Sequence, residues 1–363
     1  MTKYLLAGGG TGGHVNPLLA LAEYIKSVEP ESEVIALGTV TGLEARLVPM
    51  RGFELQTIEK LPFPRKPGFY ALKFPFRLRA AVRHLVSLIH SRDIDVVVGF
   101  GGYASAPVYL AARKAGVPYV IHEANALPGM ANRLGAKKAS AVAVAFGSTK
   151  LSNAVTTGMP LRREIEEAVS SPNQIAARLE LGLKPDVPTI LVTGGSLGAK
   201  RINETISESA SILDAAGVQT LHITGGNSEL DEISTPALKR IKYCDRMDLA
   251  IAASNLAIAR SGASTVCEFG AFGLPSVFVP YPVGNGEQGY NAADMVASGG
   301  AVMIDDAKFT PDYVRDQVIP LVSNTKELKR MSEAAKKVSI ADGTSRLYQL
   351  VQSVLPSKRT NAK

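Results

Sequence analysis

Cysteine is scarce in this sequence, because only Cys244 and Cys267 occur among its 363 residues. They are not spaced like the ligands of a zinc or iron–sulfur site, so we expect no metal centre built on thiolates. Two free thiols are typical of a protein in a reducing compartment, and we expect no disulfide. The chain is therefore predicted to work in the cytoplasm.

Long apolar runs are also missing. No segment approaches the roughly 18 consecutive apolar residues that mark a membrane-spanning helix. The first residues, Met1 to Ala7, reach a run of glycines before they could form the apolar region of a secretory signal. Any contact with a membrane is therefore predicted to be peripheral.

Acidic residues are in the minority. The sequence has 33 Asp and Glu against 40 Lys and Arg, which gives a net charge of +7 and a pI of about 9.3. This excess favours a phosphate-bearing ligand, a nucleic acid or an anionic membrane surface, without choosing among them. The hydrophobic content of 46% is ordinary for a globular protein, and the length predicts about two domains.

One pattern occurs twice along the chain: a short apolar strand, a glycine-rich loop and a helix. Tyr4–Ala7 leads into Gly8–Gly13, and Asn16 followed by Pro17 predicts a helix start with Asn16 as its N-cap. Thr189–Thr193 leads in the same way into a second glycine loop. We predict an α/β fold of two Rossmann-like domains with parallel sheets.

The first glycine loop formally matches a dinucleotide-binding fingerprint. That fingerprint also needs a carboxylate at the end of the second strand to bind a ribose. Here the strand Val34–Leu37 ends in Gly38 and Thr39, and we find no carboxylate there. The sequence therefore predicts neither a nicotinamide nor a flavin cofactor, and no other cofactor.

His14 closes the same loop. A single histidine is more often structural than catalytic, and the sequence alone leaves both roles open. The acids Asp93 and Asp95 resemble a metal-binding pair, but they precede their strand, whereas α/β sites gather at the carboxyl ends of strands. We expect them at the surface and expect no metal site.

The stretch from Ala259 to Ala292 is the most informative in the chain. A break at Ser261-Gly262 precedes a helix for which Ser264 or Thr265 is the expected N-cap, and free N–H groups there suit a phosphate. Glu268, one turn into the helix, could bind sugar hydroxyls. It also lies three residues after Thr265, so a capping box is an equally good interpretation.

The segment from Leu61 to Arg79 interleaves aromatic residues with lysines and arginines and contains no acid. This composition favours a membrane-surface patch over ordinary core and loop, and both over a nucleic-acid site. We expect no nucleic-acid partner. The side chains predicted to face the membrane are Phe69, Phe74, Phe76, Arg77 and Arg79.

Six motifs in chain order resemble the MurG family of bacterial N-acetylglucosaminyltransferases. They read GGTGGH-x-x-P, FGGY-x-S-x-P, HE-x-N, GGS-x-GA, SGA-x-T-V-x-E and E-Q-x-x-N-A. The resemblance covers nearly the whole chain. Two positions depart from it, because Ala124 and Leu197 stand where the family usually has glutamine.

The resemblance implies a GT-B fold, in which two domains face each other across a cleft. It implies inverting transfer of N-acetylglucosamine from UDP-N-acetylglucosamine to lipid I, the undecaprenyl-linked muramyl-pentapeptide acceptor, to form lipid II. It implies a peripheral protein on the cytoplasmic face of the cell membrane, with an anionic membrane surface as partner. Another GT-B enzyme, such as a UDP-N-acetylglucosamine 2-epimerase, and a non-catalytic membrane scaffold remain as alternatives.

The resemblance also implies roles for particular residues. His14 is the candidate base, with Glu123 as the second candidate. Glu268 would bind the ribose, and Gln288 and Asn291 the sugar. The complete predicted UDP-sugar site comprises Thr11, Gly12, Gly13, Asn125, Arg162, Ser196, Cys244, Ala263, Ser264, Thr265, Val266, Cys267, Glu268, Gln288 and Asn291.

The domain boundary is predicted in the Gly158–Arg162 connection. Residues 1–160 would form the acceptor-binding, membrane-associating domain, and residues 161–343 the UDP-sugar-binding domain. A last amphipathic helix, at about 344–356, is expected to return to the first domain.

Overall fold

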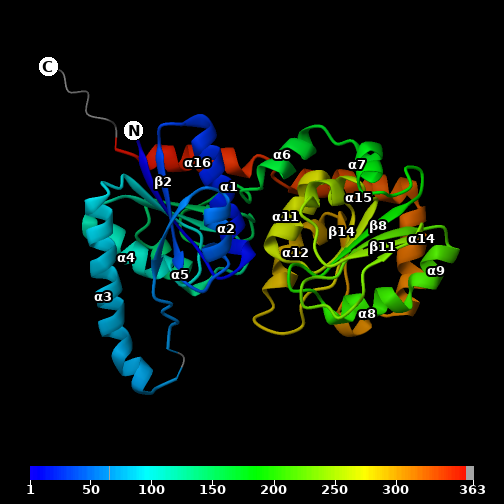
Figure 1. Ribbon diagram of the computed structural model, residues 1–363, viewed down its shortest axis with the longest axis horizontal. Helices are drawn as coiled ribbons and strands as arrows, with labels where there is room; N and C mark the ends of the chain where they lie inside the picture. Colours follow the sequence, from blue (N-terminus) through cyan, green and yellow to red (C-terminus); the bar gives the residue numbers. More distant parts are fainter. Residues whose placement is uncertain (65, 357–363) are drawn as a thin grey trace. The chain divides into compact units, whose positions relative to one another are not determined.

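The computed structural model describes residues 1–64 and 66–356 (Figure 1). The chain forms two compact units. Of the described residues, unit 1 contains those of Met1–Arg163 together with residues 342–356, and unit 2 contains Glu164–Ala341. Each unit is a sheet with helices on both faces, so the predicted α/β fold with two parallel-sheet domains is confirmed.

Unit 1 contains a parallel sheet with the strand order β3-β2-β1-β4-β5-β6-β7. Its strands are β1 (Lys3–Ala7), β2 (Glu33–Thr39), β3 (Glu54–Ile58), β4 (Val96–Gly99), β5 (Tyr119–Glu123), β6 (Ala141–Val144) and β7 (Ala154–Thr156). Its helices are α1 (Gly12–Val28), α2 (Glu44–Met50), α3 (Phe69–Ser91), α4 (Ser105–Ala115), α5 (Met130–Ala136) and α16 (Gly343–Val354).

The central strands of unit 1 are apolar throughout because helices cover both faces of the sheet. Leu5 pairs in register with Ile35 on one side and Val97 on the other, and all three side chains are fully buried. Leu6, one residue on, packs against α1 on the opposite face, in a core that includes Leu18 and Leu21. The sheet therefore separates two apolar cores.

Helix α16 comes from the far end of the chain and completes one of these cores. Leu347 and Val351 are fully buried beside α1. Tyr348 and Gln352 donate hydrogen bonds to Glu29, whose carboxylate also accepts from the Tyr4 hydroxyl. Each buried aliphatic side chain contributes about 1.5–3 kcal/mol, so α16 is an integral part of unit 1.

Unit 2 contains a sheet with the strand order β10-β11-β9-β8-β12-β13-β14, in which only β10 and β11 pair antiparallel. Its strands are β8 (Thr189–Thr193), β9 (Gln219–Ile223), β10 (Ile233–Ser234), β11 (Leu238–Ile241), β12 (Leu256–Ala259), β13 (Ser276–Phe278) and β14 (Ala301–Met303). Its first helices are α6 (Arg163–Ser170), α7 (Gln174–Glu180), α8 (Lys200–Glu208), α9 (Ala210–Ala215), α10 (Met247–Ala252), α11 (Ala263–Phe272) and α12 (Glu287–Ala297).

The last part of unit 2 is helical and packs against the core around β8 and β12. It contains a 3-10 turn (Asp306–Lys308), α13 (Pro311–Tyr313), a π-helical turn (Val314–Val318), α14 (Ile319–Ser323) and α15 (Thr325–Val338). Phe309, Val314 and Val318 are fully buried there.

Two predicted helix starts are wrong. Helix α1 begins at Gly12 after Thr11, not at Asn16, so His14 belongs to its first turn. Helix α11 begins at Ala263 with Gly262 as its N-cap, and no side chain caps it. In both cases the chain enters the helix directly from the glycine loop, which leaves the first N–H groups without intrahelical partners.

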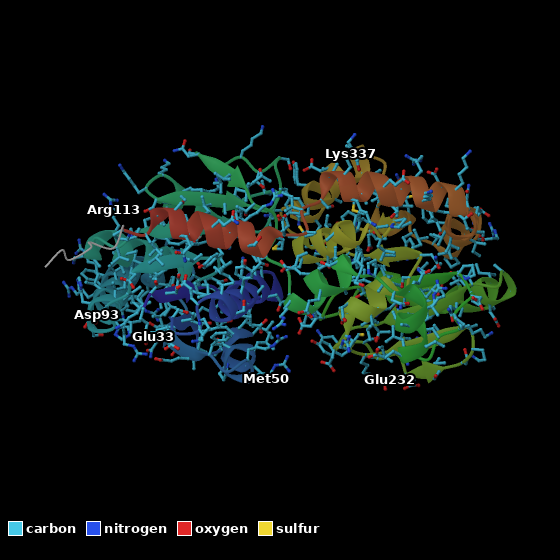
Figure 2. The ribbon with its side chains drawn as sticks, turned by 90° about the horizontal axis from the view of Figure 1, so that it is seen from above. Glu33, Met50, Asp93, Arg113, Glu232 and Lys337 are labelled. Atoms are coloured by element: carbon cyan, nitrogen blue, oxygen red, sulfur yellow. The ribbon has the colours of Figure 1, made fainter. Side chains whose placement is uncertain are left out.

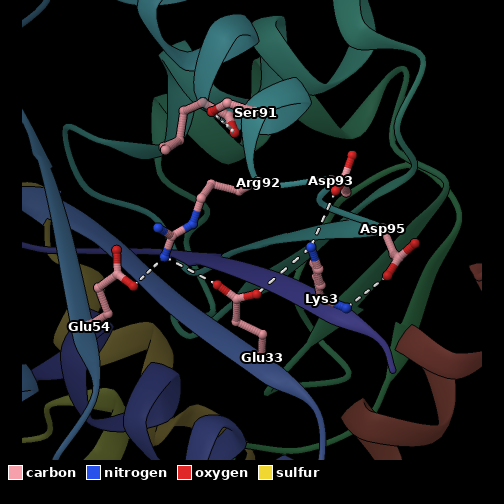
Figure 3. A network of polar contacts seen from close by, with 8 residues as sticks. Lys3, Glu33, Glu54, Ser91, Arg92, Asp93 and Asp95 are labelled. Carbon is pink, nitrogen blue, oxygen red and sulfur yellow. Dashed lines mark hydrogen bonds and ion pairs between the residues drawn. The ribbon is translucent and has the colours of Figure 1, made fainter.

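Charged residues at the amino ends of the unit 1 strands form hydrogen bonds and ion pairs with one another. The backbone N–H of Lys3 donates to Asp95, and its ammonium pairs with Asp93 at 3.3 Å (Figure 3). Arg92 pairs with Glu33 and Glu54, which begin β2 and β3. Asp93 is exposed and Glu33 is half-buried, and both are labelled in the side-chain view (Figure 2). The two aspartates are thus engaged at the end of the sheet opposite the glycine loops.

Candidate functional site

In unit 1, three neighbouring strands carry the predicted site residues at their carboxyl ends. The glycine loop Gly8–Gly13 follows β1, the turn Gly101–Tyr103 follows β4, and Glu123 ends β5. The two glycine turns approach so closely that a side chain at Gly102 would overlap the Gly9 carbonyl. Sites in α/β proteins form at this edge of the sheet, and the sequence motifs converge on it.

His14 is half-buried in this edge, in the first turn of α1. Its Nδ1 lies 3.0 Å from the Gly9 carbonyl oxygen and 3.4 Å from the Thr11 hydroxyl. A carbonyl oxygen can only accept, so the shorter contact places the ring proton on Nδ1. Nε2 faces Gly101, where a Cβ atom would stand 2.9 Å away, and in the neutral ring it is an acceptor. The geometry therefore suits a proton-accepting group.

Glu123, the second predicted catalytic residue, is almost fully buried and accepts three hydrogen bonds. One oxygen accepts from the Asn125 backbone at 2.9 Å, and the other accepts from Gly129 at 2.9 Å and the Asn132 amide at 3.0 Å. A carboxylate so occupied stabilises the loop after β5 and the start of α5. Its geometry favours a positioning role over proton transfer.

Two contributors to this edge were missed in the sequence. Asn132, on α5, is buried and joins Glu123 to the Tyr109 hydroxyl, which donates to it at 2.8 Å. Glu44, the first residue of α2, is fully buried and accepts from the backbone of Thr39 at the end of β2. A carboxylate therefore does lie at the end of the second strand, contrary to the prediction, but it is enclosed by the glycine loop. It is not exposed to a ribose.

In unit 2, three helix N-termini follow three adjacent strands. Helix α8 begins after β8 and the loop Gly194–Ala199, α11 begins after β12, and α12 begins after the loop that follows β13. Each presents the positive end of a helix dipole, and α8 and α11 also present free N–H groups. At α12 the N–H of Glu287 already donates to Asn285, and that of Gly289 donates to Gly286. Ser196 is exposed in the first of these loops. The arrangement suits a ligand with more than one phosphate.

Two serine hydroxyls beside the α11 N-terminus support this interpretation. The Oγ atoms of Ser261 and Ser264 are buried and have no hydrogen-bond partner. A buried hydroxyl without a partner is costly, at about 1–3 kcal/mol, unless a ligand supplies one. A phosphate at this N-terminus would satisfy Ser264.

The structure excludes one of the two interpretations of Glu268. Because α11 begins at Ala263, Glu268 is its sixth residue and lies in the second turn. A capping box needs the acid at the third position, so the capping interpretation is wrong. Glu268 is buried, with 8% of its surface exposed. A ligand-binding role remains the prediction for this carboxylate.

Gln288 and Asn291 both lie on α12 and differ in exposure. Gln288 is half-buried, and its Oε1 accepts from the Tyr281 backbone at 2.9 Å. Asn291 is 1% exposed and donates to the Ser261 carbonyl at 3.3 Å. Asn291 therefore stabilises the turn before α11, whereas Gln288 lies where a ligand could contact it.

The other predicted site residues fall on both units. Ala263, Val266 and Cys244 are buried in unit 2, and Thr265 and Cys267 are half-buried there. Burial raises the pKa of the Cys267 thiol, so it stays protonated. Unit 1 holds the remaining ones, which are Thr11, Gly12, Gly13, Asn125 and a half-buried Arg162.

The aromatic segment forms the start of α3 and the loop before it, with Arg65 outside the described residues. Phe69, Leu72 and Phe76 are each more than 70% exposed, at helical spacing that places them on one face. Phe74 instead packs edge-on against Phe63, with ring centroids 5.5 Å apart. The Arg77 guanidinium pairs with Glu59. We call the exposed side chains of Phe69, Leu72, Lys73, Phe76 and Arg79 the α3 patch.

Two kinds of feature are absent from the described residues. No three His, Cys, Asp or Glu side chains in residues 1–64 and 66–356 are grouped so that they could hold a metal ion. No helix in the same ranges is long and apolar enough to cross a bilayer.

Comparison with known proteins gave consistent results for both units. The glycosyltransferase family 28 N-terminal domain matches residues 4–144, and the family 28 C-terminal domain matches residues 189–347. A protein of Leifsonia xyli subsp. xyli is 54% identical over 355 residues, covering 98% of this chain and 99% of its own. A protein of Streptomyces coelicolor is 43% identical, covering 98% of both chains. Both are named UDP-N-acetylglucosamine–N-acetylmuramyl-(pentapeptide) pyrophosphoryl-undecaprenol N-acetylglucosamine transferase.

Solved structures show the same similarity. Acinetobacter baumannii MurG superposes with a TM-score of 0.77 at 27% identity, covering 98% of this chain and 100% of that one. A putative UDP-N-acetylglucosamine 2-epimerase from Listeria monocytogenes superposes with a TM-score of 0.69 at 13% identity, covering 97% of this chain and 96% of that one. The second likeness concerns the fold alone.

Proposed function

This chain belongs to glycosyltransferase family 28, and we propose that it transfers N-acetylglucosamine from UDP-N-acetylglucosamine to a lipid-linked acceptor. The acceptor is N-acetylmuramyl-(pentapeptide) pyrophosphoryl-undecaprenol, and its muramyl sugar receives the transferred group. The product is lipid II. The observation that carries this proposal is full-length identity of 54% and 43% to two proteins named for this reaction.

We assign donor binding to unit 2. The N-termini of α8 and α11, with the hydroxyls of Ser196 and Ser264, would bind the diphosphate and stabilise the charge that develops on departing UDP. Glu268 would accept hydrogen bonds from the ribose hydroxyls. The amide of Gln288 would bind the sugar, and Asn291 would hold the Ser261 turn in place.

We assign proton transfer to His14 in unit 1. The acceptor hydroxyl oxygen attacks the anomeric carbon of the donor sugar, a new C–O bond forms, and the bond to UDP breaks with its electron pair leaving on UDP. The hydroxyl proton passes to His14 Nε2. Attack opposite the leaving group inverts the anomeric configuration. Glu123 positions the neighbouring loop through its three hydrogen bonds.

The α3 patch supports peripheral binding to the cytoplasmic face of the cell membrane, where a polyprenyl-linked acceptor would be reached. Three large apolar side chains on one helix face would enter the boundary of the lipid headgroups, and Lys73 and Arg79 would pair with anionic headgroups. Phe74 and Arg77, which are engaged within unit 1, would support the patch from beneath.

Replacing Phe76 with aspartate is expected to weaken binding to vesicles of phosphatidylethanolamine and phosphatidylglycerol about tenfold, because a charge replaces an apolar anchor. Vesicle co-sedimentation measures the effect. Met50→Asp is the matched control, since both side chains are 71% exposed on unit 1 and Met50 lies outside the patch. Equal binding by Phe76→Asp and the wild type would remove the membrane role from α3.

Acceptor-dependent release of UDP tests the proposed reaction. The protein is mixed with UDP-N-acetylglucosamine, with and without a short-chain lipid-linked muramyl-pentapeptide, in the presence of EDTA. We expect release only with acceptor, and we expect it to survive EDTA because helix N-termini and hydroxyls stabilise the leaving group. Conversion of the donor into its 2-epimer, with no need for acceptor, would indicate an epimerase. Donor binding with neither release nor conversion of the donor would indicate a scaffold.

A further inference from the structure

A fully buried carboxylate lies behind the glycine loop of unit 1, and the proposed chemistry does not yet use it. Glu44 is 0% exposed. Three glycines make room for it, because a side chain at Gly9, Gly38 or Gly42 would overlap its carboxylate or stem. A buried charge costs several kcal/mol unless it is fully hydrogen-bonded, so its presence in this position calls for compensation.

The compensation comes from the two segments that Glu44 joins. Oε1 accepts from the backbone N–H and the hydroxyl of Thr39, both at 2.8 Å. Oε2 accepts from the backbone N–H of Gly10, also at 2.8 Å. Burial raises the pKa of the Glu44 carboxyl, but these hydrogen bonds outweigh burial and hold the pKa below its ordinary value. Glu44 therefore carries its negative charge in the fold.

The Gly10 N–H and the Gly9 carbonyl belong to the same peptide group. No described peptide bond is cis, so in this group the N–H and the carbonyl point in opposite directions. The N–H points to Glu44, and the carbonyl oxygen lies 3.0 Å from His14 Nδ1. One peptide thus connects a buried carboxylate to the imidazole.

We propose that Glu44 is a positioning residue that acts on His14 through the Gly9–Gly10 peptide. Its carboxylate holds and polarises this peptide, so that the carbonyl becomes a strong acceptor and fixes the proton of His14 on Nδ1. Nε2 is then the acceptor for the proton of the sugar hydroxyl. The inference rests on the proposed function, in which His14 is the base.

A glycine loop does not need a carboxylate merely to fold. The loop Gly194–Ala199 of unit 2 follows its strand in the same way, and there the Gly195 N–H donates to the neutral hydroxyl of Thr193 at 3.2 Å. A backbone bond from Gly198 to Gly195, at 2.9 Å, closes the same loop. The charged partner occurs in the loop whose carbonyl contacts a histidine, which favours a role for the charge in orienting that histidine.

The proton position on His14 can be measured directly by nitrogen NMR on protein labelled with 15N-histidine. The two ring nitrogens give different shifts according to which one carries the proton, and loss of one signal set in His14→Gln assigns the residue. In the wild type under alkaline conditions we expect the proton on Nδ1. A proton on Nε2 overturns the proposal, whatever the variants show.

Glu44→Gln removes the charge while keeping the shape. If the amide oxygen of the new glutamine side chain still accepts from Thr39, its NH2 group faces the Gly10 N–H. Two donors cannot form a hydrogen bond, so the Gly9–Gly10 peptide loses its acceptor. We expect His14 to become a mixture of its two neutral tautomers, one with the proton on Nδ1 and one with it on Nε2. We expect kcat to fall about tenfold and the donor KM to stay within about twofold of the wild-type value. A fall in kcat with an unchanged proton position overturns the proposal.

Thr39→Val is the matched control, because it removes a hydrogen bond from the same carboxylate but leaves the link to Gly10. We expect the wild-type proton position in this variant. If the proton of His14 moves to the same extent in Glu44→Gln and Thr39→Val, the cause is a general loss of structure, and the proposed action of Glu44 through the Gly9–Gly10 peptide is overturned. If His14→Ala keeps full activity while Glu44→Gln still shifts the ring proton of His14, the action of Glu44 on His14 stands. The assignment of His14 as the base then fails.

Discussion

Replacing His14 with alanine is expected to lower kcat by about two to four orders of magnitude, the usual contribution of a positioned general base. The acceptor hydroxyl would then have to lose its proton to water. Because His14 lies on unit 1, whereas Ser264 and Glu268, to which we assign donor binding, lie on unit 2, the donor KM should change little. Steady-state UDP release at saturating acceptor measures both constants.

An exposed histidine of the same unit provides the control. His84 lies on the exposed side of α3, and His84→Ala should leave kcat unchanged. A fall in kcat of less than tenfold in His14→Ala would exclude His14 as the base. Glu123 would then be the next candidate, although it would first have to release some of its three hydrogen bonds.

Replacing Glu268 with glutamine is expected to raise the donor KM by about ten- to a hundredfold. The reason is that a hydrogen bond to a charged acceptor contributes about 1.5–3 kcal/mol, and the neutral amide would lose most of it. The substitution keeps the volume of the side chain, so the fold of α11 should persist. Donor titration by isothermal calorimetry gives the affinity without turnover.

Glu204→Gln is the control for this substitution, because Glu204 is a half-exposed acid on α8 of the same unit. It should leave the donor affinity unchanged. The Tm of Glu268→Gln should also stay near that of the wild type. A lowered Tm with unchanged donor affinity would return Glu268 to a structural role.

The strands that lead into the two glycine loops were predicted correctly, because their signals are local, whereas β3 and β11 were not predicted. A short apolar run such as Tyr4–Ala7 indicates a buried strand when glycines follow it at once. The helix starts were harder. Asn16-Pro17 and Ser264-Thr265 are good capping sequences, yet α1 and α11 start earlier, at Gly12 and Ala263. Local capping preference is a weak signal, and tertiary structure overrides it at both helices.

The supporting residues of the site could not be predicted, because their partners are distant in the sequence. Glu44 contacts Gly10 and Asn132 contacts Glu123, and no periodicity or motif marks either pair. A signal for Glu44 does exist in retrospect, since Gly38 and Gly42 flank an acid at the end of a strand. The two departures from the family pattern differ in setting: Ala124 is buried, whereas Leu197 is 72% exposed.

Because α16 packs in unit 1 but follows unit 2 in the chain, unit 1 cannot complete its folding until unit 2 has been synthesised. The ribosome finishes every strand of unit 1 by Thr156 and then makes all of unit 2 before Leu347 and Val351 exist. At 5–20 residues per second, the gap lasts on the order of ten to forty seconds. During this interval the face of α1 that α16 will cover is open to water or to chaperones. The nascent chain is therefore most vulnerable to aggregation and proteolysis in its first-made half, and the formation of α16 ends that period.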